Sequence, residues 1–338
     1  MWGIKIDIRL ILLLVVGQAI AMLLAMTGFF STNLTERGFI FPILQSAGFY
    51  LMLALYLIKW PFPLRMPIYL YAILAVFDVE ANFLAVMAYQ FTDITSILLL
   101  NSLTIPWVVI LSYFVLKRRY SWRKVIATGI CLVGLGLVVV SDSLRHRWGE
   151  AFVSSETAWK GDLICVASSF LYALQNVLQE YILKRLGRSD TGTTSEYFGM
   201  LGIFGLLISV VQWTIFERSE VISAGSALWT GEVIGYYMGF IFTMVTLYTS
   251  ITWFIGTYDA SLFNMSILTS GIYGLLLEFI QKRSSPRGAS DWMYFVAYGL
   301  IVSGVLLYST GEGVQDDKKS CESTASLSEP LSPSLTKN

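Results

Sequence analysis

The sequence predicts an all-α polytopic membrane protein with ten transmembrane helices arranged as two inverted five-helix repeats. Hydrophobic residues make up 55% of its 338 residues and charged residues 14%, whereas an ordinary soluble domain has about 25% charged residues. The charges gather in short segments between apolar runs, and about 20 consecutive apolar residues span a bilayer as a helix. These observations exclude a water-soluble globular fold, a disordered chain and a coiled coil.

Ten apolar runs are long enough to be spans. The first five are Ile8–Phe30, Phe39–Ile58, Pro67–Tyr89, Ile94–Leu116 and Val125–Ser141. The second five are Gly161–Leu183, Tyr197–Phe216, Val233–Ile255, Ala260–Ile280 and Trp292–Tyr308. They divide the chain into a first repeat at 1–141, a connecting loop at 142–160, a second repeat at 161–310 and a polar tail at 311–338. The serine-rich tail has too little apolar surface to fold alone, so we expect it to be disordered.

Basic residues indicate how the chain is inserted. If the N-terminus is cytosolic, most lysines and arginines fall on the cytosolic side, including the cluster at 117–124. This excess agrees with the positive-inside rule and puts both termini in the cytosol, as an even number of spans requires. The basic loop at 282–287 falls on the opposite side, an exception that an inverted repeat would account for.

An internal repeat is visible in the sequence. When Thr95–Arg118 is shifted by 165 residues onto Ala260–Arg283, seven of 24 positions are identical, including the Lys-Arg pair that ends both segments. Gly136 in the fifth span likewise corresponds to Gly304 in the tenth. Because five helices is an odd number, the second copy enters the membrane from the opposite side. Inverted repeats of this kind are typical of transporters, which bind substrate near the midplane between the repeats.

Short motifs lie at Asp78–Asn82, Ala88–Gln90, Gln175–Val177 and Gly199–Gly202. Together they resemble the F branch of solute carrier family 35, in the drug/metabolite transporter superfamily. The resemblance implies a fold of five plus five inverted helices with cytosolic termini. It also implies carriage of a nucleoside-, nucleobase- or nucleotide-sugar-like metabolite across an endomembrane (Golgi or vacuole-like) or the plasma membrane of a eukaryote.

Two acids in the third span are the first candidates for the site. At 100° per residue, Asp78, Asn82 and Tyr89 share one helix face, and Glu80 points away from it. A charged side chain at mid-bilayer costs at least about 2.5 kcal/mol and usually marks a pathway. The alternative is that both acids are hydrogen-bonded packing residues, and the sequence leaves open which of them faces the cavity. Asn101, in the fourth span, is a further candidate, although the resemblance leads us to expect an acid there and at Ser270.

Polar stripes mark the sixth and eighth spans. Substrate-binding candidates in these spans are Tyr172, Gln175, Gln179, Thr243 and Trp253. The sixth-span residues continue a stripe from Ser168, and the eighth-span residues flank Thr246 and Ser250. Such a stripe needs a wet or hydrogen-bonding environment, although small hydroxyl residues also mediate helix packing. Glu180 lies four residues before Lys184, which predicts an ion pair at the membrane edge.

The absence of cations from the spans bears on the substrate. No Lys or Arg lies deep in any of them, whereas a pyrophosphate would need a buried cation or several helix N-termini. We therefore favour a neutral or cationic organic substrate, on which aromatic residues would stack.

The predicted function is secondary-active transport of a small organic metabolite by alternating access around a midplane cavity. A membrane-embedded enzyme is the main alternative, but the chain shows no nucleophile with a base and no metal-ligand cluster. A receptor or scaffold is a weaker alternative, because the loops are short. We expect a small-molecule substrate and the lipid bilayer as partners, with no nucleic acid, cofactor or metal. The sequence leaves open proton coupling against exchange, and a monomer against a homodimer.

Two kinds of residue outside the pathway are also noteworthy. Cys131, Cys165 and Cys321 are expected to be free thiols, because they form no disulfide framework. Asn33 begins an Asn-Leu-Thr triplet in the first non-cytosolic loop, which makes it a candidate for N-glycosylation.

Overall fold

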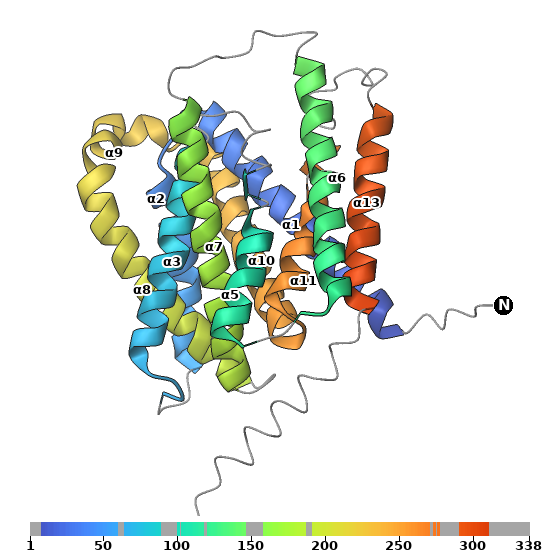
Figure 1. Ribbon diagram of the computed structural model, residues 1–338. Coiled ribbons are helices and arrows are strands. Elements are labelled where there is room, and N and C mark those ends of the chain that lie inside the picture. Colours follow the sequence, from blue (N-terminus) through green and yellow to red (C-terminus); the bar gives the residue numbers. More distant parts are fainter. Residues whose placement is uncertain are drawn as a thin grey trace, which may run out of the picture.

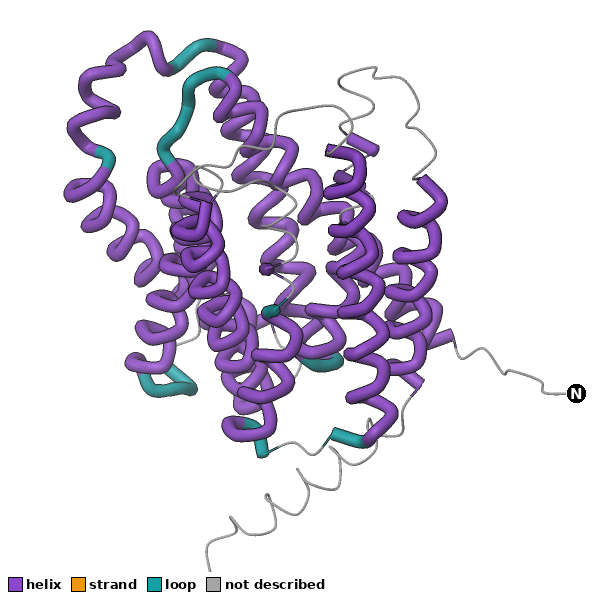
Figure 2. The backbone as a smooth tube through the Cα atoms, turned by 45° about the horizontal axis from the view of Figure 1, so that its top comes forward, coloured by secondary structure: helices purple, strands orange, loops and turns teal. Residues whose placement is uncertain are grey.

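The computed structural model describes residues 8–59, 64–88, 100–101, 103–117, 120–146, 158–186, 191–270, 273–274, 276–277 and 291–310. Its ordered elements over these residues are all helices, with no strand (Figure 2). The α-helices are α1 (Ile8–Glu36), α2 (Pro42–Ala54), α3 (Ile68–Ala88), α5 (Thr104–Val115), α6 (Trp122–His146), α7 (Ala158–Leu186), α8 (Thr191–Phe216), α9 (Arg218–Ala224), α10 (Gly231–Thr257), α11 (Ala260–Ser266) and α13 (Asp291–Thr310). Short 3₁₀ helices are η1 (Leu55–Lys59), η2 (Gly225–Leu228) and η3 (Ile267–Thr269).

The described helices include several that are long and apolar enough to cross a membrane. Four meet this condition by length and composition: Leu12–Glu36, Ile68–Ala85, Thr194–Phe216 and Gly231–Thr257. Shorter apolar helices lie at Pro42–Ile58, Thr104–Val115, Ala260–Thr269 and Gly299–Tyr308. The prediction of an all-helical membrane protein agrees with this architecture.

The start of α2 is defined by proline and a distant carboxylate. Pro42 occupies the first turn, where its missing N–H is no loss. Glu217, beyond the end of α8, accepts the N–H of Ile43 at 2.7 Å and that of Leu44 at 2.9 Å. A carboxylate is favourable there because the first N–H groups of a helix have no intrahelical acceptor.

The turn between α10 and α11 is held in a similar way. Asp259 caps α11 by accepting the N–H of Leu262 at 2.7 Å. Glu180 on α7 accepts the N–H of Ala260 at 2.9 Å. These side chains explain how two apolar helices are joined by so short a connection.

Two segments differ from the sequence-based expectation. Helix α6 runs on to His146 and α7 begins at Ala158, so both ends of the expected 142–160 loop are helical. Helix α9 follows α8 directly and was not predicted, because hydropathy does not distinguish a short surface helix from a loop. Ile222 within it is 63% exposed, and Gly225 ends it with a φ of 56°.

The helices pack in a pattern that brings the two halves of the chain together (Figure 1). Helix α3 lies between α7 and α8, and α2 packs against α8 and α10. Helix α1 crosses α10, while α6 and α13 run side by side at one edge of the molecule.

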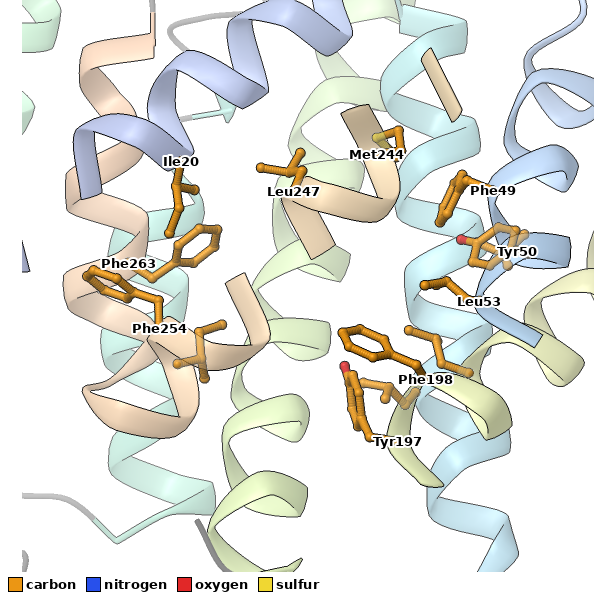
Figure 3. Close-up of a cluster of buried hydrophobic side chains, with 14 of the residues drawn as sticks. Ile20, Phe49, Tyr50, Leu53, Tyr197, Phe198, Met244, Leu247, Phe254 and Phe263 are labelled. Atoms are coloured by element: carbon orange, nitrogen blue, oxygen red, sulfur yellow. The ribbon is translucent and has the colours of Figure 1, made fainter. Parts of the chain in front are cut away.

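Aromatic side chains fill much of the interior. Figure 3 shows Phe49, Tyr50 and Leu53 of α2 near Tyr197 and Phe198 of α8, and all five are fully buried. The rings of Phe49 and Tyr50 lie 4.1 Å apart. Between helices in lipid, such close packing replaces the hydrophobic effect as the source of stability.

The contact between α6 and α13 depends on glycine. A Cβ on Gly134 would lie 2.8 Å from the carbonyl oxygen of Ala297, and one on Gly304 would lie 2.5 Å from Cys131 Sγ. Gly136, which the sequence comparison matched to Gly304, has nothing within 4 Å of its Cβ position. The close contact of α6 with α13 is therefore made at Gly134 and not at Gly136, and such small residues let helix backbones approach closely in membranes.

We expect Gly134→Leu to lower the thermal unfolding temperature of the detergent-purified protein, because the new side chain meets the backbone of α13. The expected cost is about 1–3 kcal/mol, as for other overpacked sites. Gly136→Leu is the matched control on the same helix and should unfold near the wild-type temperature. Equal destabilisation by both substitutions would contradict the close contact at Gly134.

Candidate functional site

The carboxylate of Asp78 is the centre of a buried polar cluster. Asp78 is only 1% exposed. Its Oδ2 accepts a hydrogen bond from the Tyr50 hydroxyl at 2.6 Å, and its Oδ1 accepts one from the Tyr248 hydroxyl at 2.9 Å. Tyr50 comes from α2 and Tyr248 from α10, so the acid on α3 joins helices from both halves of the chain.

Asn82 completes this cluster one turn further along α3. Its Nδ2 donates to the Asp78 carbonyl oxygen at 2.8 Å and lies 3.1 Å and 3.3 Å from the hydroxyl oxygens of Tyr248 and Tyr50. Its Oδ1 accepts the hydroxyl of Tyr172 on α7 at 3.1 Å. The Asp78 cluster, as we call it, consists of Tyr50, Asp78, Asn82, Tyr172 and Tyr248.

The electrostatics of the cluster are unusual for a buried acid. Over the described part of the chain, no Lys or Arg forms an ion pair with Asp78. Two phenol donors take the place of a cation, and hydrogen bonds to an ionised acceptor are stronger than neutral ones. Tyr197 on α8 adds a buried hydroxyl that has no hydrogen-bond partner among the described residues.

Glu80 belongs to a different contact. Its Oε1 accepts a hydrogen bond from Gln212 on α8 at 2.5 Å, and its side chain is half-buried. The two acids of the third span therefore have separate surroundings, as their angular separation on the helix predicts.

The polar stripe of α7 is satisfied inside the protein. Ser168 donates to the Ala81 carbonyl at 3.0 Å, and Tyr172 reaches the Asp78 cluster. Gln175 donates to Gln179 at 3.2 Å. Gln179 in turn donates to Thr252 of α10 at 3.0 Å. The structure thus brings only Tyr172 of this stripe to Asp78, and it places the two glutamines in a second network between α7 and α10.

The polar stripe of α10 lies apart from the cluster. Thr243 is buried, but Thr246 and Ser250 donate to carbonyls of their own helix. Trp253 is 41% exposed and meets the edge of the Tyr258 ring.

Sequence reasoning missed Tyr248 and Tyr50. Tyr248 is five residues from Thr243, which turns it about 140° away from the stripe. A single tyrosine in an apolar helix has no periodic signal, so only packing identifies it.

Other predicted residues have simpler surroundings. Asn101 Oδ1 accepts from the Cys165 thiol at 3.4 Å. The ion pair between Glu180 and Lys184 is confirmed, with 2.7 Å between Oε1 and Nζ. Tyr89 lies outside the described residues.

Asn33 has a position that bears on its modification. It lies within α1, is 1% exposed, and its Nδ2 donates to the Phe29 carbonyl at 2.9 Å. Its Oδ1 accepts from Arg37 at 3.1 Å. A buried, hydrogen-bonded amide disfavours glycosylation at this site.

The described residues include an apolar hollow but no cluster of metal-ligating side chains. Groups of three His, Cys, Asp or Glu side chains suited to a metal ion do not occur among them. A hollow of about 560 Å³ lies at α5 and α6, away from the Asp78 cluster. It is lined by Val109, Ile110, Tyr113, Phe114, Tyr120 and Val125.

Comparison with known proteins places the chain in a family. The family model of solute carrier family 35, F branch, matches residues 6–310. Solute carrier family 35 member F2 of Mus musculus is 31% identical over 303 residues, covering 86% of this chain and 76% of the mouse protein. A solute carrier family 35 member of Schizosaccharomyces pombe is 33% identical over 238 residues, covering 70% of this chain and 44% of the yeast protein.

The fold also has a counterpart among solved structures. One crystal structure superposes with a TM-score of 0.63 at 18% identity, covering 90% of this chain and 98% of the other. Together with the apolar helices, the match over residues 6–310 means that the chain belongs to solute carrier family 35, in its F branch, and is a membrane transporter of a solute.

Proposed function

We propose that the protein is a secondary-active transporter that moves a small organic metabolite by alternating access, with the Asp78 cluster as its coupling site. The observation that carries this proposal is the pair of phenol bonds on the Asp78 carboxylate. Tyr50 donates from the first half of the chain and Tyr248 from the second. A buried charge held by both halves is sensitive to any movement of one half against the other, which alternating access requires.

The proposed architecture is ten spans in two inverted repeats, and the packing pattern supports it. In the proposed repeat, the counterparts are α1 and α7, α2 and α8, α3 and α10, α5 and α11, and α6 and α13. Exchanging each helix for its counterpart converts the contact between α1 and α10 into that between α7 and α3. The same exchange converts α3–α8 into α10–α2, and α5–α7 into α11–α1. All six contacts occur in the structure. The contacts α2–α8 and α6–α13 map onto themselves and also occur.

The α6–α13 interface supports the repeat at the level of residues. Each glycine approaches two residues of the opposite helix, and a shift of 170 residues relates the two sets. The pairs related by this shift are Gly134 and Gly304, Ala127 and Ala297, and Cys131 and Ile301. This register differs from the 165-residue shift between the fourth and ninth spans, as expected if the loops of the two halves differ in length.

The chemistry of the cluster favours a nucleoside- or nucleobase-like substrate that is neutral or cationic. The cluster offers a carboxylate, an amide and three phenols, which suit N–H donors and planar rings. A nucleotide-sugar-like substrate carries a pyrophosphate, and the cluster contains no cation to receive it.

We further propose that both termini are cytosolic and that the tail at 311–338 is dispensable. Truncation after Gly311 should leave the unfolding temperature and the rate of solute uptake at their wild-type values, because the tail sequence has no apolar face to pack on the helices. Size-exclusion chromatography and uptake into liposomes check this expectation. A truncated chain that aggregates would contradict it.

Asp78→Asn should cut solute uptake about tenfold or more, or abolish its dependence on pH, while expression stays near normal. Asparagine keeps the shape of the side chain, but it can neither ionise nor bind a proton at the pH values of the assay. The measurement is uptake of labelled nucleosides into liposomes that contain the purified full chain, over a series of pH values.

Glu80→Gln is the matched control for this experiment. It neutralises a second acid of α3 whose partner is Gln212 rather than the cluster, so uptake should follow the wild-type pH profile. Wild-type uptake and pH response in both variants would leave Asp78 as a packing residue and refute the proposed coupling site.

The substrate class is tested by thermal shift of the purified chain. Nucleosides, nucleobases and cationic ring compounds should raise its unfolding temperature, since ligand that binds only the folded state stabilises it. UDP- and GDP-sugars should have no effect, because the cluster lacks a cation. Stabilisation by nucleotide sugars alone would overturn the proposed substrate class.

A further inference from the structure

We propose that Tyr248 is a latch between the two halves of the transporter, and that protonation of Asp78 releases it. This inference rests on the coupling role proposed for Asp78 and deepens it, because it names the contact through which a proton would change the conformation. It follows from the directions of the hydrogen bonds in the Asp78 cluster.

The orientation of the Asn82 amide is determined by its neighbours. The Asp78 carbonyl oxygen, 2.8 Å away, can only accept, so the atom facing it must be the Nδ2 donor. The Oδ1 atom then faces Tyr172, whose hydroxyl must donate to it at 3.1 Å.

The phenol protons of Tyr50 and Tyr248 therefore point at Asp78. After its bond to the Asp78 carbonyl, Nδ2 of Asn82 has one hydrogen left to share between the two hydroxyl oxygens, so both face a donor rather than an acceptor. Each phenol has one hydrogen, and each directs it to one carboxylate oxygen. This arrangement suits an ionised carboxylate, which only accepts.

Protonation of Asp78 gives the cluster more hydrogens than its contacts around the carboxylate can hold. The cluster has two short O···O contacts around the carboxylate, one to each phenol, and each contact holds one hydrogen. A protonated Asp78 adds a third hydrogen, so one hydroxyl is left without an acceptor. Proteins avoid buried donors of this kind, and one phenol must leave.

Tyr248 is the phenol that leaves. Tyr50 is fully buried and makes the shorter bond to Asp78 at 2.6 Å. Tyr248 is partly exposed and makes the longer bond at 2.9 Å. Because Tyr248 belongs to α10, its release removes a bond between the second half of the chain and α3.

The other titratable groups near Asp78 are either phenols or acids with partners elsewhere. The elements around it present Tyr50 on α2, Tyr172 on α7, Tyr197 on α8 and Tyr248 on α10. Among the described side chains of α3, α7, α8 and α10, the other carboxylates make their contacts as Glu80 with Gln212, Glu180 with Lys184 and Ala260, Glu196 with Tyr71, and Glu232 with Arg37. Within the described residues, Asp78 is thus the acid whose charge state acts on Tyr248.

The test measures distance between α2 and α10 in the full chain, in lipid nanodiscs and without any solute. Spin labels are attached through Ile40→Cys, two residues before α2, and Ile234→Cys in α10, which are exposed positions, with Cys321→Ser to avoid labelling the tail. The wild type should show one distance at alkaline pH and a second population that grows as the pH falls.

The two phenols predict different effects. Tyr248→Phe removes the latch, so the second population should be present at every pH, raised about tenfold at alkaline pH, as expected for the loss of one hydrogen bond. Tyr50→Phe removes one contact and one hydrogen together, so protonation of Asp78 still adds one hydrogen too many and the second population should still grow as the pH falls. Asp78→Asn accepts from a single phenol and should resemble Tyr248→Phe.

Tyr237→Phe is the matched control. Tyr237 also joins α10 to α2, but its hydroxyl donates to the carbonyl oxygen of Leu44 at 2.9 Å. A backbone carbonyl does not titrate at the pH values of the experiment. This variant should switch with pH as the wild type does.

A wild-type pH response in Tyr248→Phe, or a Tyr50→Phe variant that keeps the first distance at low pH, would overturn the latch. Since no solute is present, this outcome is separate from failure of the coupling site, which the uptake of Asp78→Asn reports.

Discussion

Much of this structure depends on how a buried carboxylate is kept without a cation. Asp78 is surrounded by apolar helices, and two phenols and the neighbouring asparagine supply the hydrogen bonds that water would supply outside. Four helices must meet at one point to do this, so the polar cluster determines where α2, α3, α7 and α10 approach one another. A buried lysine would stabilise the carboxylate mainly through its charge. Phenols stabilise it through directed hydrogen bonds, which a change of conformation alters directly.

The same chemistry recurs where helices begin. Glu217 binds two N–H groups at the start of α2, and Glu180 binds the first N–H of α11. Glu196 accepts the backbone N–H groups of Arg65 and Met66 just before α3, at 3.0 Å and 3.3 Å. Each acid is distant in sequence from the helix it binds, so these contacts join helices as well as cap them. Burial raises the pKa of Glu217, whereas its two N–H donors oppose that shift.

Glycine contacts and aromatic rings both contribute to the remaining packing. Gly134 and Gly304 let α6 and α13 approach at one edge, and Gly202 and Gly205 let α8 approach Ala54 and Tyr50 of α2. Large rings fill space beside this second contact (Figure 3).

The sequence by itself determined the helical membrane class, because apolar runs and charge placement are local properties that the bilayer imposes. It also placed Asp78 and Asn82 on one face, separated Glu80 from them, and predicted the pair of Glu180 and Lys184, since the helical period relates residues a few positions apart. Helix ends were less predictable: α9 and the helical ends of the 142–160 loop lie outside the bilayer constraint.

Only the tertiary structure decided which residues meet Asp78. Tyr50 is 28 residues away and Tyr248 is 170 residues away, and neither belongs to a polar stripe. Packing likewise determines that Gly134 of α6, rather than Gly136, lies against α13. These partners are set by the packing of helices that are distant in sequence. A single tyrosine or glycine in an apolar run has no sequence periodicity from which its partner could be predicted.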